Sequence, residues 1–109
     1  MVSPAKDNSL LAKRLKSARE SLNISQMELG VRAGIDEFSA SARINQYERG
    51  KHAPGFDTAK TLAKVLGIPT AYLYCEDESL AELIATYGQL TASQKKSVLQ
   101  FAKSLWLSR

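Results

Sequence analysis

The sequence has 109 residues, of which 44% are hydrophobic and 24% charged, with a formal net charge of +4. This length accommodates one compact core and an accessory element, and the composition excludes an intrinsically disordered chain. No apolar run approaches the roughly 18 residues of a membrane-spanning helix, and the N-terminus lacks the apolar segment of a signal peptide, so we expect a cytoplasmic protein.

Helical spacing of apolar residues extends through nearly the whole chain, and no segment alternates as a half-buried strand does. The predicted fold is therefore all-α. Residues 1–8 are expected to form a flexible N-terminus, with Asn8 or Ser9 as the N-cap of the first helix. Its inner stripe consists of apolar residues at steps of four, three and four, namely Leu11, Leu15, Ala18 and Leu22.

Two short helices are predicted within residues 24–50. Ser25 and Glu28 have the spacing of a capping box at a helix start. This helix should end at Gly34, because a glycine can adopt the left-handed conformation that stops a helix. The next helix should end at residues 49–50, with Ile44 and Tyr47 on its inner face. Such a pair is typical of a helix-turn-helix, in which one helix enters the DNA major groove and the other braces it.

A fourth and a fifth element complete a five-helix unit. Residues 51–55 are expected to form a loop because they contain a proline and a glycine. The fourth helix should stop at Gly67, and Pro69 opens a short fifth segment that ends near Leu73. The inner face of the fourth helix consists of Ala59, Leu62, Ala63 and Leu66.

Two further helices are predicted in residues 76–109, which we separate from the unit of residues 9–75. Capping-box spacing occurs at Ser79–Glu82 and at Thr91–Gln94, so we expect a C-terminal helical hairpin. Its apolar faces need cover, either from the five-helix unit or from a second chain, and we favour dimerisation. The residues of these faces are Leu80, Leu83, Ile84, Tyr87, Val98, Leu99, Ala102, Leu105 and Trp106.

The charge is unevenly distributed along the chain. Residues 1–55 contain nine Lys or Arg and six Asp or Glu, whereas residues 56–109 contain six and five. A basic excess suits a polyanionic partner because contacts to phosphate release counterions, although a solvated surface accounts for it equally well. Cys75 and His52, each the single residue of its type, have no partners at metal-ligand spacing, so we expect no metal and no cofactor.

Several segments together resemble the Xre/Cro-type DNA-binding domain of phage repressors and bacterial regulators. The resemblance implies a five-helix, lambda-repressor-like domain that binds a pseudo-palindromic operator in double-stranded DNA as a homodimer and controls transcription. We expect a repressor. It rests on Arg14-Leu15-Lys16, Arg19, residues 24–29, Gly34-Ile35, residues 44–50, Leu62-Ala63 and residues 66–68.

The resemblance also implies roles for individual residues. Gln26 matches a glutamine that bonds a DNA phosphate, and Gln46 matches a position that reaches base edges, where glutamine bonds adenine bidentately. Arg19 and Glu48 match an ion pair that joins the first and third helices. Ser41 and Ala42 match the other base-facing positions, flanked by Arg43 and Asn45, and further candidates for phosphate contacts are Arg14, Arg49, Lys51 and His52.

One segment departs from the family pattern. Between Gly34 and Ile44 the chain is about four residues longer than usual, close to one helical turn of ~3.6 residues. Either the third helix begins one turn earlier or the preceding loop is longer. In a continuous helix Phe38 would lie four residues before Ala42 on the DNA-facing side, where an exposed ring is unfavourable. We therefore expect a longer loop, with Phe38 folded onto the core and the helix starting near Ser39 or Ala40.

The sequence thus predicts a DNA-binding transcriptional regulator. A rival interpretation is a protein-interaction module of the antitoxin or anti-repressor type, which keeps the fold but binds another protein through its C-terminal helices. An enzyme is not expected, since no nucleophile, base and acid group together and no phosphate-binding loop is present. The operator, the sign of regulation and any small-molecule effector are not specified by the sequence.

Overall fold

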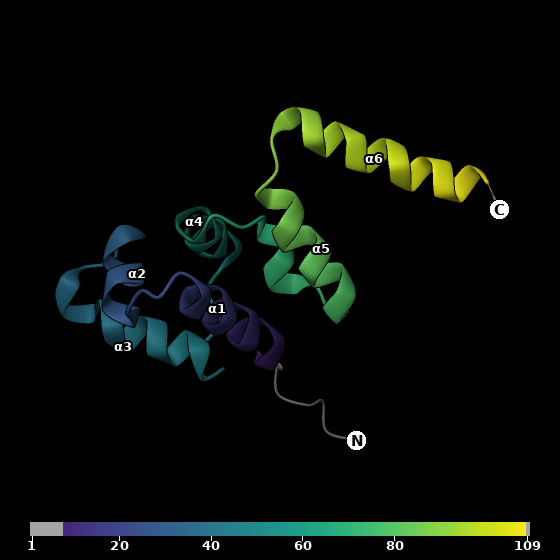
Figure 1. Cartoon of the computed structure of the whole chain (residues 1–109). Helices are drawn as coiled ribbons and strands as arrows, with labels where there is room; N and C mark the ends of the chain where they lie inside the picture. The colour runs from purple at the N-terminus through teal and green to yellow at the C-terminus, as the bar shows by residue number, and fades with distance from the viewer. Residues whose placement is uncertain (1–7, 109) are drawn as a thin grey trace, which may run out of the picture.

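A computed structural model describes residues 8–108, and every regular element in that range is a helix (Figure 1), which confirms the predicted all-α fold. The predicted flexible N-terminus falls almost entirely on residues 1–7, which lie outside the described residues. The elements are α1 (Ser9–Ser21), α2 (Gln26–Arg32), α3 (Glu37–Glu48), α4 (Phe56–Leu66), the 3-10 helix η1 (Thr70–Tyr74), α5 (Glu78–Gly88) and α6 (Ala92–Leu107).

Most helix ends follow from local chemistry. Asn8 precedes α1 as predicted, and the Ser25 hydroxyl accepts a 2.9 Å bond from the Glu28 N–H at the start of α2. The reciprocal half of that capping box is replaced, because the Glu28 carboxylate pairs with Arg32 instead. Gly67 ends α4 with a φ of +70°, the left-handed conformation expected there.

The predicted N-cap is wrong for α5 and correct for α6. The expected Ser79–Glu82 box is wrong, because α5 begins two residues earlier, with the Asp77 carboxylate accepting a 2.8 Å bond from the Leu80 N–H. The box at Thr91 and Gln94 is confirmed, with reciprocal bonds of 2.9 and 3.1 Å. Aspartate and serine are about equally good N-cap residues. The helix starts at the earlier of the two, Asp77.

The core lies among α1 to α4 and η1. The largest fully buried side chains come from all five elements: Leu15, Leu29, Ile44, Leu62 and Leu73. Burying each of them contributes about 1.5–3 kcal/mol before the entropic cost of folding is subtracted. The predicted inner faces of α3 and α4 are confirmed. On α1 the prediction is wrong for Leu22, which follows the last residue of the helix and is 45% exposed. The core contacts α3 on one side only.

The tail divides into one docked and one projecting helix. In α5, Ala81 is buried, and at its end Gly88 lies so close to Pro69 that a Cβ there would be 2.6 Å from the proline ring. Just beyond, the Gln89 amide donates a 2.7 Å bond to the Gly67 carbonyl. In contrast, α6 has no buried residue and extends away from the other helices (Figure 1). The expected hairpin is therefore open, and only its first helix packs on the five-helix unit.

None of the helices in residues 8–108 is both long and apolar enough to cross a lipid bilayer.

Candidate nucleic-acid interface

α2 and α3 cross in close contact. A Cβ atom at Gly30 would lie 2.6 Å from the Cβ of Ala40 and 3.0 Å from its Cα, so only glycine fits opposite this alanine. The turn between the helices passes through Gly34, at a φ of +90°, and the Ile35 N–H donates a 2.9 Å bond to the Gly30 carbonyl. α2 is thus held tightly against α3, whose remaining face is left open.

The start of α3 contradicts the expected longer loop. The helix begins at Glu37, with the Asp36 carboxylate accepting a 3.1 Å bond from the Phe38 N–H, and the Phe38 side chain is 90% exposed. The Gly30–Ala40 contact explains this, because it requires Ala40 to lie inside a helical turn. Phe38, two residues earlier, then faces outward. The four-residue spacing of Phe38 and Ala42 is compatible with this continuous helix, and the exposure of the ring does not prevent it.

The outer face of α3 lies opposite the buried residues Ala40, Ile44 and Tyr47. At 100° per residue, Phe38, Ala42, Asn45 and Arg49 follow one stripe directly opposite this core. The predicted reading residues Ser41, Ala42, Arg43 and Gln46 are all exposed, and Asn45 is half-buried. The fold therefore brings these residues together on one accessible helix.

Gln26 occupies the junction between α2 and α3. Its amide nitrogen donates to Asn45 Oδ1 at 3.3 Å and to Glu48 Oε1 at 3.1 Å. Both amide hydrogens are therefore engaged within the protein. The phosphate bond that the sequence predicts for Gln26 requires exchange of one of them, and the longer bond to Asn45 is the one more easily exchanged.

Arg19 and Glu48 form the predicted ion pair. Arg19 Nε and Nη2 donate to the two Glu48 carboxylate oxygens at 2.6 and 3.0 Å, and Nη1 donates to the Ile24 carbonyl at 2.8 Å. The side chains are only 13% and 3% exposed. Hydrogen bonding to the carboxylate raises the pKa of Arg19 above its usual value. The pair ties α1 to the last turn of α3, so it sets the angle of the exposed helix.

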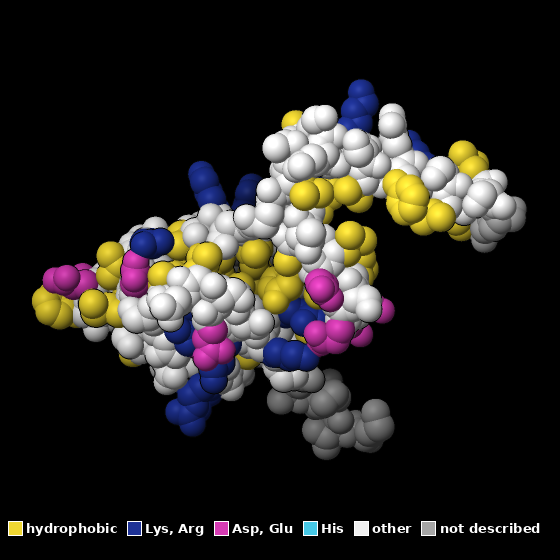
Figure 2. Space-filling model, viewed as in Figure 1, with side chains coloured by type: hydrophobic (Ala, Val, Ile, Leu, Met, Phe, Trp, Pro, Cys, Tyr) yellow, Lys and Arg dark blue, Asp and Glu magenta, His cyan; other side chains and the backbone are white. Residues whose placement is uncertain are grey.

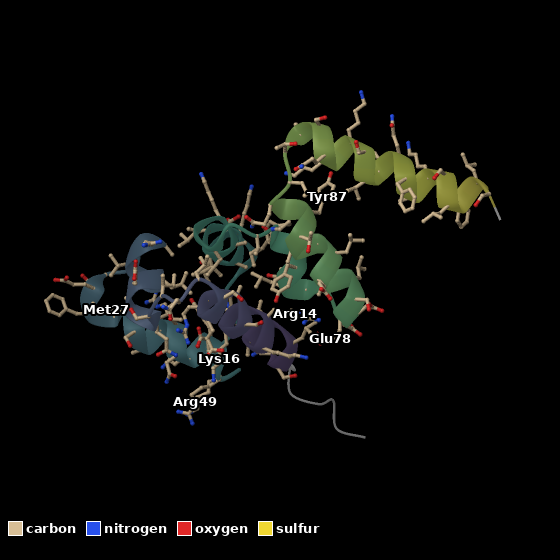
Figure 3. All side chains as sticks on the ribbon, in the orientation of Figure 1. Arg14, Lys16, Met27, Arg49, Glu78 and Tyr87 are labelled. Carbon is tan, nitrogen blue, oxygen red and sulfur yellow. The ribbon has the colours of Figure 1, made fainter. Side chains whose placement is uncertain are left out.

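Arg14 is not available for phosphate, and that prediction is wrong. Its buried guanidinium donates from Nε and Nη2 to the Cys75 carbonyl at 3.0 and 2.8 Å, and from Nη1 to Glu78 at 3.1 Å. In Figure 3 the Arg14 and Glu78 side chains point toward one another. Hydrogen bonds from Lys13 and Arg14 lower the pKa of Glu78 to about 2. Arg14 thus fastens α5 to α1, a role that only the docked tail reveals.

The other basic candidates lie at the far end of α3. Arg49 and Lys51 are both exposed, and Figure 3 shows Arg49 projecting away from the body of the protein. Lys51 is held near the helix end by a 3.0 Å bond from its N–H to the Gln46 carbonyl. The outer face of α3 therefore runs from an apolar and acidic first turn to a basic end.

Comparisons with known proteins agree with this geometry. Residues 15–73 match the helix-turn-helix family HTH_3. A solved chain, described as the crystal structure of transcriptional regulator BswR, matches with a TM-score of 0.83 and 48% sequence identity, over 89% of this chain and 96% of that chain. No curated protein sequence matches the chain. The family match contains both α2 and α3, and the structural match extends into the tail.

Proposed function

The chain belongs to the helix-turn-helix family HTH_3, a family of DNA-binding regulators, and from this premise we propose a more specific function. The protein binds a pseudo-palindromic operator as a homodimer, inserts α3 into the major groove of each half-site, and represses transcription in the cytoplasm. The observation that carries the proposal is the exposed outer face of α3, braced by α2 and by the Arg19–Glu48 pair.

The chemistry of that face supports base reading. Gln46 has an amide that bonds adenine N6 and N7 bidentately, and Arg43 has the planar donors that suit guanine or phosphate. Ser41 adds a hydroxyl, and Ala42 a methyl group that contacts thymine. At the end of the helix, Arg49 and Lys51 are exposed cations that suit phosphates, since such contacts release counterions.

Selection of duplexes from a random pool tests this function. We expect the wild-type protein to enrich an inverted repeat, with affinity that falls by about 0.9 log units per log unit of salt for each phosphate contact. Gln46→Ala should lose about 1–3 kcal/mol of discrimination at one base pair in each half-site, because the bidentate bond is lost.

The matched control for that variant is Gln100→Ala, which removes an exposed glutamine from α6, far from α3. It should leave the selected sequence unchanged. Equal specificity of Gln46→Ala and wild type would refute the assigned role of Gln46. If the protein enriches no duplex and instead binds a protein partner with an affinity that does not depend on salt, it acts as a protein-interaction module.

Dimerisation through the tail is part of the proposal. Figure 2 shows hydrophobic side chains along the side of α6 that faces α5. Eight of the nine residues predicted for this role are large, and six of those eight are exposed: Leu80, Leu83, Tyr87, Leu99, Leu105 and Trp106. An apolar surface of this kind is uncommon on a monomer and supports an isologous interface between two copies.

Changing the α6 face should separate the copies. We expect wild-type protein at tens of micromolar to scatter light as a dimer, and Leu99→Lys with Leu105→Lys to scatter as a monomer, because two charges cannot be buried in an apolar interface. Gln100→Lys adds a charge to the opposite side of α6 and should remain dimeric. A monomeric wild-type protein would contradict the proposed interface. It would not contradict the fold, because no residue of α6 is buried.

A further inference from the structure

Phe38 is the most exposed of the large hydrophobic side chains in residues 8–108, at 90%. Its backbone N–H is bonded to the Asp36 carboxylate, but its ring lies outside the hydrophobic core. Leaving a phenylalanine ring in water forfeits the burial that usually stabilises a fold. The fold therefore gains little from this ring, which is accessible to a partner.

The position of Phe38 associates it with the DNA-reading face. It lies one turn before Ala42 on the stripe that continues to Asn45 and Arg49, directly opposite the core residues of α3. One helical turn advances ~5.4 Å, and successive phosphates on a strand are ~3.4 Å apart along the duplex. Phe38 thus extends the reading face by about one to two base pairs.

The charges around Phe38 decide which part of the duplex it meets. Asp36 and Glu37 immediately precede it, and both are exposed. Two carboxylates repel the phosphate backbone, so this turn is poorly suited to the rim of the groove. The base edges on the groove floor remain, and there the thymine C5-methyl group offers apolar contact to a phenylalanine ring.

We propose that Phe38 is a specificity-determining residue that reads a thymine methyl group in the major groove, beyond the positions read by Ala42 and Gln46. This inference rests on the proposed DNA-binding function. The extra turn of α3 is then not a loop insertion but a lengthening of the reading helix by one apolar contact. An exposed ring also fits an interface with a second protein chain, and the experiment below distinguishes that interface from DNA contact.

Duplex selection with wild-type protein and with Phe38→Ala tests the proposal. Wild type should enrich thymine at one outer position of each half-site, and Phe38→Ala should lose that preference. At this position, replacing thymine by deoxyuridine removes only the methyl group. It should weaken wild-type binding about fourfold per half-site, the effect of one buried methyl, and should leave Phe38→Ala binding unchanged.

Phe56→Ala is the matched control, because Phe56 is also an exposed phenylalanine in the first turn of a helix but lies on α4, away from α3. It should keep both the thymine preference and the deoxyuridine effect. Circular dichroism should show that both variants fold, since neither ring is in the core.

Three results would overturn the inference and leave the proposed DNA-binding function intact. One is an equal deoxyuridine effect in wild type and Phe38→Ala, and another is a uniform loss of affinity for all sequences in Phe38→Ala. A change in oligomeric mass on Phe38→Ala would assign the ring to a second chain. Failure of the wild-type protein to enrich any duplex would instead refute the proposed DNA-binding function, and the inference with it.

Discussion

Arg19→Met is expected to lower the free energy of unfolding by about 3–4 kcal/mol, because removing one partner of a buried ion pair leaves the other charge uncompensated. The stranded charge is Glu48, whose side chain is 3% exposed and whose remaining hydrogen-bond donor is the Gln26 amide, at 3.1 Å. The Ile24 carbonyl also loses a donor. Urea denaturation monitored by circular dichroism measures the change.

Arg32→Met provides the matched control for this prediction. Arg32 pairs with Glu28 one turn away on α2, but both side chains are substantially exposed, at 52% and 43%. Such a pair contributes about 0.3–0.5 kcal/mol. Similar losses in the two variants would show that the Arg19–Glu48 pair does not brace the fold. The double variant Arg19→Met with Glu48→Met should recover part of the loss, because no buried charge remains.

Gly30→Val is expected to destabilise the protein by about 3 kcal/mol, the upper part of the range for overpacking a close contact. A Cβ at this position meets the Ala40 Cβ at 2.6 Å and the Ala40 backbone at 3.0 Å, and no flexible side chain is available to move aside. α2 and α3 must therefore separate. Under the proposed function, affinity for DNA should also fall at temperatures where the variant stays folded, because α3 is displaced.

Two further variants make this prediction specific. Gly55→Val introduces the same side chain where a Cβ meets no atom within 4 Å and φ is −63°, so it should cost no more than about 1 kcal/mol. Adding Ala40→Gly to Gly30→Val should restore part of the stability by removing the opposing methyl group. If Gly30→Val is as stable as wild type, the α2–α3 crossing is looser than the structure indicates.

The helices and their inner faces were predictable because they depend on local interactions. The caps at Ser25, Thr91 and Gly67 each involve residues within one turn of one another. Apolar spacing identified the buried positions of α3 and α4 and those of α1 up to Ala18, but not Leu22, which is exposed. The family resemblance added Arg19 and Glu48, which are distant in the sequence and whose pairing local spacing does not reveal.

The misplaced start of α5 is a local error, a choice between two nearby caps, Asp77 and Ser79. The other errors involve contacts between elements. In the sequence, Arg14 resembles any basic residue on the polar face of an amphipathic helix. Its burial depends on the docking of α5 and on the Cys75 carbonyl, which accepts two hydrogen bonds from its guanidinium. Phe38 was assigned to the core because the crossing of Gly30 and Ala40, which fixes the start of α3, is not visible in either helix alone.

The sequence by itself determined the helical fold, most of the helix ends, the core and the helix-turn-helix pair, because hydrophobic periodicity and capping act over a few residues. The tertiary structure decided which polar and apolar side chains remain outside. In the folded protein Arg14 is buried, the Gln26 amide is hydrogen-bonded within the protein and Phe38 is exposed. Burial and hydrogen-bond partners depend on neighbours that only the packed helices bring together.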